Sequence, residues 1–290
     1  MVESKGTSEI SATNIMKKVA KYTVGVKEMK GVIELNGKTM NKRLVGEFLA
    51  ITFIIMIIFW GGSALISQIF DVTIDNVFLR IMHMVGGFSP TIASYVSLKR
   101  NNKVRNFKEW VKKIFDIKHN ISVYMLAGLF VLIYYTIGCT MNGFEFGAPF
   151  FMVFVIVPMM LFGGGNEEVG WRMILQPELE KKWGFNIATI FTAATWWLWH
   201  LPIFFIKGTA NADMNYYLFG IMCLTLSYAL ATVRRVSKGV FPCILLHCLI
   251  NGLSAIFLFN YSLPSCCVSL IVTIVLSNLV LNFQRKPEAA

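Results

Sequence analysis

Three short polar segments interrupt long apolar stretches in the second half of the chain. Their chemically useful side chains are Glu167, Glu168, Arg172, His200, His247 and Asn251. Ionisable side chains at the depth of a bilayer are costly, so their presence there indicates a function. Carboxylates and imidazoles can deprotonate a water molecule, and imidazole and amide groups can donate hydrogen bonds to an oxyanion. The three segments together therefore predict chemistry on a peptide bond.

The two adjacent glutamates point in different directions, because successive helix positions are turned by about 100°. Glu168 and Arg172 are four residues apart, so they share a helix face and can form an ion pair that offsets the cost of burying both charges. Glu167 has no such partner in its own helix, which makes it the candidate general base. The preceding glycines, Gly163 to Gly165, predict a helix break, with Asn166 as a candidate N-cap.

The imidazole and amide groups lie on two further apolar segments. His200 follows Trp196 by one helical turn, and His247 precedes Asn251 by one turn, so each pair shares a helix face. In one interpretation, Glu167 deprotonates a water molecule with help from His200. His247 and Asn251 then donate hydrogen bonds to the oxyanion that forms.

The alternative is a metal site. Its candidate ligands are Glu167, His200 and His247, with the second carboxylate as base. The chain has no H-E-x-x-H pair, and asparagine is a poor zinc ligand. The residues therefore favour hydrolysis that requires no cofactor, while a divalent metal such as zinc stays open as the alternative.

The elements that position these residues are predicted to be membrane helices. Hydrophobic residues make up 56% of the 290 positions, only 15% are charged, and the mean hydropathy is +0.60, which excludes an ordinary soluble domain. Continuously apolar runs favour helices over an alternating barrel pattern. The runs long enough to span a bilayer cover 46–69, 81–98, 121–141, 148–176, 185–206, 214–233, 239–260 and 264–283. The sequence thus predicts an all-α integral membrane protein with about eight transmembrane helices.

The basic residues predict the orientation of this bundle. All but two of the 27 Lys and Arg residues fall in the N-terminal segment, the even-numbered connections and the C-terminal tail, and the exceptions are Arg80 and Lys207. The positive-inside rule then places both termini in the cytoplasm. The net charge of +11 is explained by this orientation and by attraction to an anionic inner leaflet, so no nucleic acid partner is needed.

The chain is predicted to form one membrane domain with two polar ends. Residues 1–45 form a polar basic cytoplasmic segment without a cleavable signal peptide, expected to be flexible or to lie on the membrane surface. Residues 46–283 form the membrane domain, with the chemical motifs in 148–260, and residues 284–290 form a cytoplasmic tail. The six cysteines show no metal-binding spacing and are interpreted as packing residues.

The motifs resemble those of the CAAX protease and bacteriocin-processing family of intramembrane endopeptidases, also called the Abi family. That pattern has two adjacent glutamates before an arginine, an aromatic residue four positions before a histidine, and a histidine four positions before an asparagine. The matching residues are Glu167-Glu168-Val169-Gly170-Trp171-Arg172, Trp196 with His200, and His247 with Asn251. The resemblance covers the last five predicted spans and excludes the first three.

The resemblance implies an eight-helix protease in the cell membrane, with a cavity that faces the cytoplasm. Relatives cleave near the C-terminus of lipidated CAAX proteins or serve bacteriocin maturation and immunity, so a membrane-associated or lipidated protein or peptide is the implied substrate. By matching position, Glu167 would activate water with assistance from His200. His247 and Asn251 would form the oxyanion site, and the adjacent glutamate–arginine pair would orient and support them. The family includes enzymes described as metalloproteases, so the resemblance leaves the metal alternative open.

Two other functions compete with a peptidase. A non-catalytic immunity or partner-binding membrane protein could keep the same polar groups for binding. A proton-coupled transporter could use them as a relay, but such transporters usually show repeated halves with broken helices in matching positions. The acidic pair has no counterpart elsewhere in the chain, so the transporter is the weaker alternative.

Overall fold

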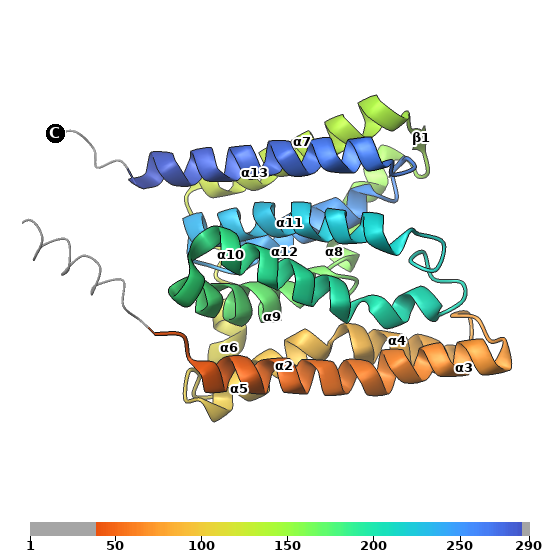
Figure 1. Ribbon diagram of the computed structural model, residues 1–290, viewed down its shortest axis with the longest axis horizontal. Coiled ribbons are helices and arrows are strands. Elements are labelled where there is room, and N and C mark those ends of the chain that lie inside the picture. The colour runs from red at the N-terminus through yellow and green to blue at the C-terminus, as the bar shows by residue number, and fades with distance from the viewer. Residues whose placement is uncertain (1–38, 286–290) are drawn as a thin grey trace, which may run out of the picture. The chain divides into compact units, whose positions relative to one another are not determined.

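The computed structural model describes residues 39–285. Contacts divide the chain into Met1–Met40 and Asn41–Ala290, and the second unit holds the helices and strands of Figure 1. Its α-helices are α2 (Lys42–Met56), α3 (Gly62–Phe70), α4 (Val77–Gly87), α5 (Ser89–Arg100), α6 (Phe107–Ile114), α7 (Ile121–Asn142), α8 (Val153–Met159), α9 (Glu168–Gly170), α10 (Gln176–Trp199), α11 (Tyr216–Ser237), α12 (Phe241–Leu253) and α13 (Leu263–Arg285). The predictions for residues 1–38 and 286–290 lie outside the described residues.

Short helical segments and one pair of strands complete the unit. The helical segments are π-helical at Ile57–Gly61 and Trp171–Leu175, and 3-10 at Phe150–Met152, Gly165–Glu167 and Leu201–Phe205. Strands β1 (Glu145–Phe146) and β2 (Phe257–Leu258) pair antiparallel and are the only strands within residues 39–285. The prediction of an all-α membrane protein is therefore confirmed for the described part of the chain.

Asparagine side chains start five of these helices. They are Asn41 before α2, Asn76 before α4, Asn106 before α6, Asn120 before α7 and Asn215 before α11. Each side-chain oxygen accepts a hydrogen bond from a backbone N–H of the first turn, which would otherwise lack a partner. These asparagine caps therefore fix the residue at which each of the five helices begins.

The apolar helices fall into a long and a short group. Five segments are long and apolar enough to cross a bilayer: Lys42–Phe70, Ile121–Asn142, Gly165–Phe205, Tyr216–Ser237 and Leu263–Gln284. Three shorter apolar helices are Val77–Gly87, Phe150–Met159 and Phe241–Leu253. Every predicted run contains at least part of one of these helices, but the number of crossings and the side of each terminus stay predictions.

The predicted span 148–176 is wrong as one continuous helix. Helix α8 ends at Met159, a turn follows, and a new helical path begins at Gly165 and continues to Phe205. Gly164 in the turn has φ of +143°, which side chains with a Cβ rarely adopt, so the predicted glycine break is confirmed. Gly184, where φ is +71°, separates two helical segments within α10 and lies in the predicted connection between the fourth and fifth spans. Gln176 and Thr189, on either side of it, are joined by a hydrogen bond of 3.1 Å. Asn166 does not cap a helix, because Gly164 occupies that position.

Packing places the short helix α9 deep inside the unit. Helix α9 contacts both α5 and α12, while α2 packs on α5 and α11 packs on α10 and α13. The adjoining Trp171 is fully buried and meets Phe48 of α2 edge to face, with ring centroids 5.4 Å apart. A Cβ at Gly170 would lie 2.8 Å from the Phe48 ring, so glycine permits this approach. The two adjacent glutamates are thereby held in the buried centre of the unit.

Candidate active site

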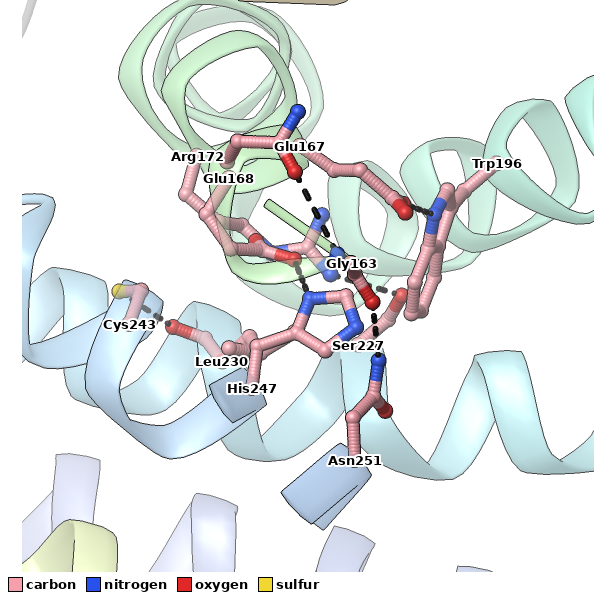
Figure 2. Close-up of polar contacts among 12 residues, drawn as sticks. Gly163, Glu167, Glu168, Arg172, Trp196, Ser227, Leu230, Cys243, His247 and Asn251 are labelled. Carbon is pink, nitrogen blue, oxygen red and sulfur yellow. Dashed lines mark hydrogen bonds and ion pairs between the residues drawn. The ribbon is translucent and has the colours of Figure 1, made fainter. Parts of the chain in front are cut away.

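The predicted site residues come from three places in the fold. The glutamates and Arg172 lie on the helical path that starts after Gly164, His200 follows the last residue of α10, and His247 and Asn251 lie on α12. Figure 2 shows the acidic, imidazole and amide side chains directed toward a common region. The structure thus brings together all six residues that the sequence singled out.

Glu167 is buried beside an indole and an imidazole. Its Oε2 accepts a hydrogen bond from Trp196 Nε1 at 2.6 Å (Figure 2). The same oxygen lies 3.9 Å from His200 Nε2. Its Oε1 accepts no hydrogen bond from the described residues. Glu167 makes no ion pair with Arg172 within this part of the chain, as the helical spacing predicted. The carboxylate therefore keeps acceptor capacity for a molecule in the site.

Glu168 is the centre of a fully buried charge network. Its Oε2 lies 3.4 Å from Arg172 Nε, which confirms the predicted ion pair. Its Oε1 accepts a hydrogen bond from His247 Nδ1 at 2.7 Å (Figure 2). Arg172 in turn donates from Nη2 to Ser227 Oγ at 2.9 Å. Because breaking a buried pair leaves an uncompensated charge, this network holds helices α9, α11 and α12 in register.

His200 is fixed by one hydrogen bond and an aromatic cage. Its Nδ1 lies 2.8 Å from the carbonyl oxygen of Trp196. The rings around it belong to Trp199, Phe219, Trp196 and Trp60, with centroid distances of 4.6, 4.9, 5.4 and 5.9 Å. A carbonyl oxygen can only accept, so Nδ1 carries a proton and Nε2 of the neutral ring is an acceptor directed at Glu167.

Asn251 and His247 meet the glycine turn. Asn251 Nδ2 donates to the carbonyl oxygen of Gly163 at 3.1 Å (Figure 2). A Cβ added to Gly164 would clash with Asn251 Nδ2 and lie 3.0 Å from His247 Nε2. Glycine at this position therefore leaves a small space that both nitrogen atoms border.

A cavity of about 680 Å³ connects these groups. Its polar lining includes Glu167, Trp196, His200, His247 and Asn251. Methionine, phenylalanine and isoleucine side chains form much of the remaining wall. A cavity of this size with few convergent polar groups is typical of a small-molecule or peptide site.

The three candidate metal ligands Glu167, His200 and His247 all line one cavity. Within residues 39–285, no three His, Cys, Asp or Glu side chains are grouped closely enough to hold a metal ion in the arrangement described. Glu167 uses Oε2 to accept from an indole, and His247 uses Nδ1 to contact Glu168, a contact that metal-binding histidines also make. The requirement for a metal therefore stays a prediction to be tested.

Sequence reasoning missed three contributors to the site. Trp196 was identified only as a neighbour of His200, not as the donor to Glu167. Ser227 carries no signal in the apolar run of α11, yet it binds Arg172. His83 lines the cavity and stacks on Trp60, with ring centroids 5.6 Å apart. All three contacts join segments far apart in sequence, so residue spacing could not reveal them.

Comparison with known proteins finds a family model that matches the part of the chain holding the site. Residues 149–253, which include all six predicted site residues, match the family described as type II CAAX prenyl endopeptidase Rce1-like. A curated relative, the CAAX prenyl protease 2 of Methanococcus maripaludis, is 25% identical over 175 residues, which are 56% of this chain. The chain spans 64% of that relative's length.

Fold and site together define a helical, multi-pass membrane protein with a buried polar centre. The family model and the relative both support the resemblance to the CAAX protease and bacteriocin-processing family that the sequence motifs indicated.

Proposed function

We propose that the chain is an intramembrane endopeptidase of the CAAX type, placed in the cell membrane. Its substrate is a membrane-associated or lipidated protein or peptide, cleaved in CAAX-type processing or in bacteriocin-related maturation or immunity. The observation that carries the proposal is the placement of Glu167 Oε2 and His200 Nε2, 3.9 Å apart at the wall of one cavity. The family match supports it.

The two acceptors suit activation of a water molecule. A water about 2.8 Å from each atom fits between acceptors separated by 3.9 Å. It would donate one hydrogen bond to Glu167 and one to His200, which leaves its lone pairs free for a peptide carbonyl carbon. Glu167 takes the proton as water attacks and returns it to the leaving amine, while His200 holds the water in position.

The tetrahedral oxyanion would be stabilised on the opposite side of the site. His247 Nε2 and Asn251 Nδ2 border the space beside Gly164, so both can donate to one oxygen atom there. Because His247 Nδ1 already donates to Glu168, donation from Nε2 requires the imidazolium form. The Glu168 carboxylate is the counter-ion of that charge, and Arg172 keeps Glu168 in place.

The experiment uses purified full-length protein in liposomes and a peptide set prepared with and without a farnesyl group on cysteine. Cleavage is followed by mass spectrometry. We expect the wild type to cleave a subset of these peptides and Glu167→Gln to cleave none. Glu145→Gln, which changes an exposed glutamate of β1, is the matched control and should remain active. Cleavage of no peptide by the wild type, combined with host protection that survives Glu167→Gln, would favour the non-catalytic alternative.

The same preparation tests the requirement for a metal. Metal content is measured in active wild-type protein and in a His200→Ala, His247→Ala double variant. Because the proposed reaction needs no metal, we expect full activity in protein whose metal content is far below one ion per chain. Stoichiometric metal that is lost together with activity in the double variant would contradict the proposal.

A further inference from the structure

The lining of the cavity includes one cation that the proposed reaction does not use. Among the described residues that line it, Glu167 and Arg80 are the only Asp, Glu, Lys or Arg side chains. Glu167 is the proposed general base, whereas Arg80 has no role in the reaction. Arg80 also lies outside residues 149–253, which match the family model. A single cation in a largely apolar wall is the kind of polar group that fixes the orientation of a ligand.

Arg80 belongs to the face of α4 that lines the cavity. This face contributes four lining residues, Arg80, His83, Met84 and Gly87. Their spacing of three, four and seven residues places them on one side of the helix. The face ends beside the site, because the Gly87 carbonyl oxygen lies 3.5 Å from the side-chain nitrogen of Asn166, the residue before Glu167. Arg80 starts about 10 Å further along the helix axis, so it lies in the same cavity but away from the reacting atoms.

Trp60 holds this face of α4 in place relative to the site. Its Nε1 donates a hydrogen bond to the carbonyl oxygen of His83 at 2.6 Å. Its ring centroid lies 4.2 Å from that of Trp199 and 5.9 Å from that of His200. A Cβ at Gly86 would clash with the Trp60 ring, so glycine permits this packing. The position of Arg80 is therefore coupled through one indole to the position of His200.

The guanidinium of Arg80 is available to an incoming group. Its Nη2 lies 3.5 Å from Asp75 Oδ1, and the two side chains are 63% and 87% exposed. Exposed ion pairs of this kind are weak, so a competing anion can displace the aspartate. Arginine binds a carboxylate through two parallel hydrogen bonds, which gives both strength and orientation. Asp75 thus holds the place that a carboxylate of a ligand would take.

We propose that Arg80 is a specificity-determining residue that binds a carboxylate of the substrate. This inference rests on the proposed peptidase function and deepens it, since it names a chemical group of the substrate apart from the bond that is cleaved. The carboxylate is either the free C-terminus of the peptide or an acidic side chain, because both present the same planar group to a guanidinium. The wall between Arg80 and the site is mostly apolar, so the rest of the bound segment is apolar.

Peptide binding tests the role of Arg80 without any need for cleavage. Full-length protein is placed in nanodiscs of phosphatidylcholine, so that no anionic headgroup competes for the guanidinium. Every protein carries Glu167→Gln, so that the peptide is not consumed. The probe is a fluorescently labelled hexapeptide of alanine, leucine and methionine, prepared as the free acid, as the C-terminal amide, and as the amide with aspartate as its last residue. Fluorescence anisotropy gives Kd for each form.

The variants compare Arg80 with an arginine elsewhere on the surface. Arg80→Gln removes the charge, and Arg80→Lys keeps the charge but not the planar pair of donors. Arg43→Gln is the matched control, because Arg43 is 69% exposed, lies 3.0 Å from Glu47 and does not line the cavity.

We expect at least one carboxylate form to bind about 10-fold more tightly than the plain amide, the effect of a hydrogen bond to a charged group. This ratio should fall close to one in Arg80→Gln, be partly retained in Arg80→Lys and stay unchanged in Arg43→Gln. The form that binds most tightly shows whether the C-terminus or a side chain supplies the carboxylate. Equal or unmeasurable binding of all three forms would overturn the proposal, as would a ratio that persists in Arg80→Gln.

Asp75→Asn is a second variant that leaves Arg80 in place. Removal of the competing carboxylate should raise the preference for the carboxylate form roughly 2- to 5-fold. If Arg80→Gln fails to fold, a preference that falls or stays unchanged in Asp75→Asn would overturn the proposal instead. Because binding rather than cleavage is measured, a failure here leaves the peptidase proposal standing, and an inactive chain leaves the role of Arg80 measurable.

Discussion

Trp196 donates its indole N–H to the Glu167 carboxylate at 2.6 Å, and its backbone carbonyl oxygen lies 2.8 Å from His200 Nδ1. One residue of α10 therefore orients both groups that would hold the water molecule. The indole fixes one carboxylate oxygen, and the carbonyl oxygen fixes the tautomer of the histidine. Trp196 also meets His247 edge to face, with ring centroids 5.5 Å apart, so it touches three of the proposed functional side chains.

The first prediction concerns this indole. Trp196→Phe keeps an aromatic ring but removes a hydrogen bond to a charged group, which is worth about 1.5–3 kcal/mol. We expect kcat for peptide cleavage to fall roughly 10- to 100-fold, with a smaller change in KM. Trp197→Phe is the matched control, because that indole donates to the Tyr216 carbonyl oxygen and does not line the cavity. Equal kcat values for the two variants would show that the Glu167 contact has no role in catalysis.

The second prediction separates the two glutamates by stability. Glu168→Gln removes the charge that compensates buried Arg172 and contacts His247, and breaking such a pair costs about 3–5 kcal/mol. We expect unfolding of the purified protein in detergent to occur at a clearly lower temperature, together with loss of activity. Glu145→Gln on the exposed strand β1 is the control and should unfold like the wild type. An unchanged Tm for Glu168→Gln would argue against a structural role for this network.

The third prediction tests the space beside Gly164. A Cβ there would clash with Asn251 Nδ2 and approach His247 Nε2, so Gly164→Ala should displace both proposed oxyanion donors. Loss of one such donor typically lowers kcat about 100-fold or more. Gly143→Ala is the control for backbone strain, because φ is +69° there but the added Cβ would meet no atom within 4 Å. If the two variants lose activity equally, strain rather than the oxyanion site is responsible.

The fourth prediction concerns the pH dependence of the ion pair between Asp71 and Lys207. The hydrogen bond from Lys207 lowers the pKa of Asp71, which follows the last residue of α3. A lowered pKa in the folded state means that Asp71 adds stability above its unfolded pKa and loses it as the pH falls through the folded value. We therefore expect the wild type to lose slightly more thermal stability than Asp71→Asn as the pH falls below about 4. Asparagine tolerates the left-handed conformation of this position, where φ is +56°, so the comparison isolates the charge.

The measurement compares Tm as a function of pH for the wild type and for Asp71→Asn. Parallel losses of Tm in the wild type and in Asp71→Asn would show that the contact between Asp71 and Lys207 adds no stability. The effect is small in any case, because exposed ion pairs contribute little.

The sequence predicted those features of the site that follow from helical spacing. The Glu168 to Arg172 ion pair follows from a four-residue separation, and the break before Glu167 follows from consecutive glycines. The contact between His247 and Glu168 could not be predicted in this way, because it depends on how α12 packs against α9. Residue spacing describes one helix at a time, whereas the register between helices depends on side-chain packing.

The position of the cavity was also beyond the sequence. The distribution of basic residues predicts which ends of the helices are cytoplasmic. It does not predict where a cavity lies between the helices. Residues such as Ser254 and Ala210 have no distinctive type or spacing, yet they line the cavity.

The central claim is that Glu167 is the general base, and the most direct test is the single-turnover rate of Glu167→Gln. Glutamine has the same shape and its carbonyl oxygen can still accept from Trp196, so the fold should be retained with an unchanged Tm. We predict that the rate of peptide cleavage falls by about 10²- to 10⁴-fold, the usual contribution of general acid–base catalysis. Cleavage at the wild-type rate by a folded Glu167→Gln protein would contradict the account.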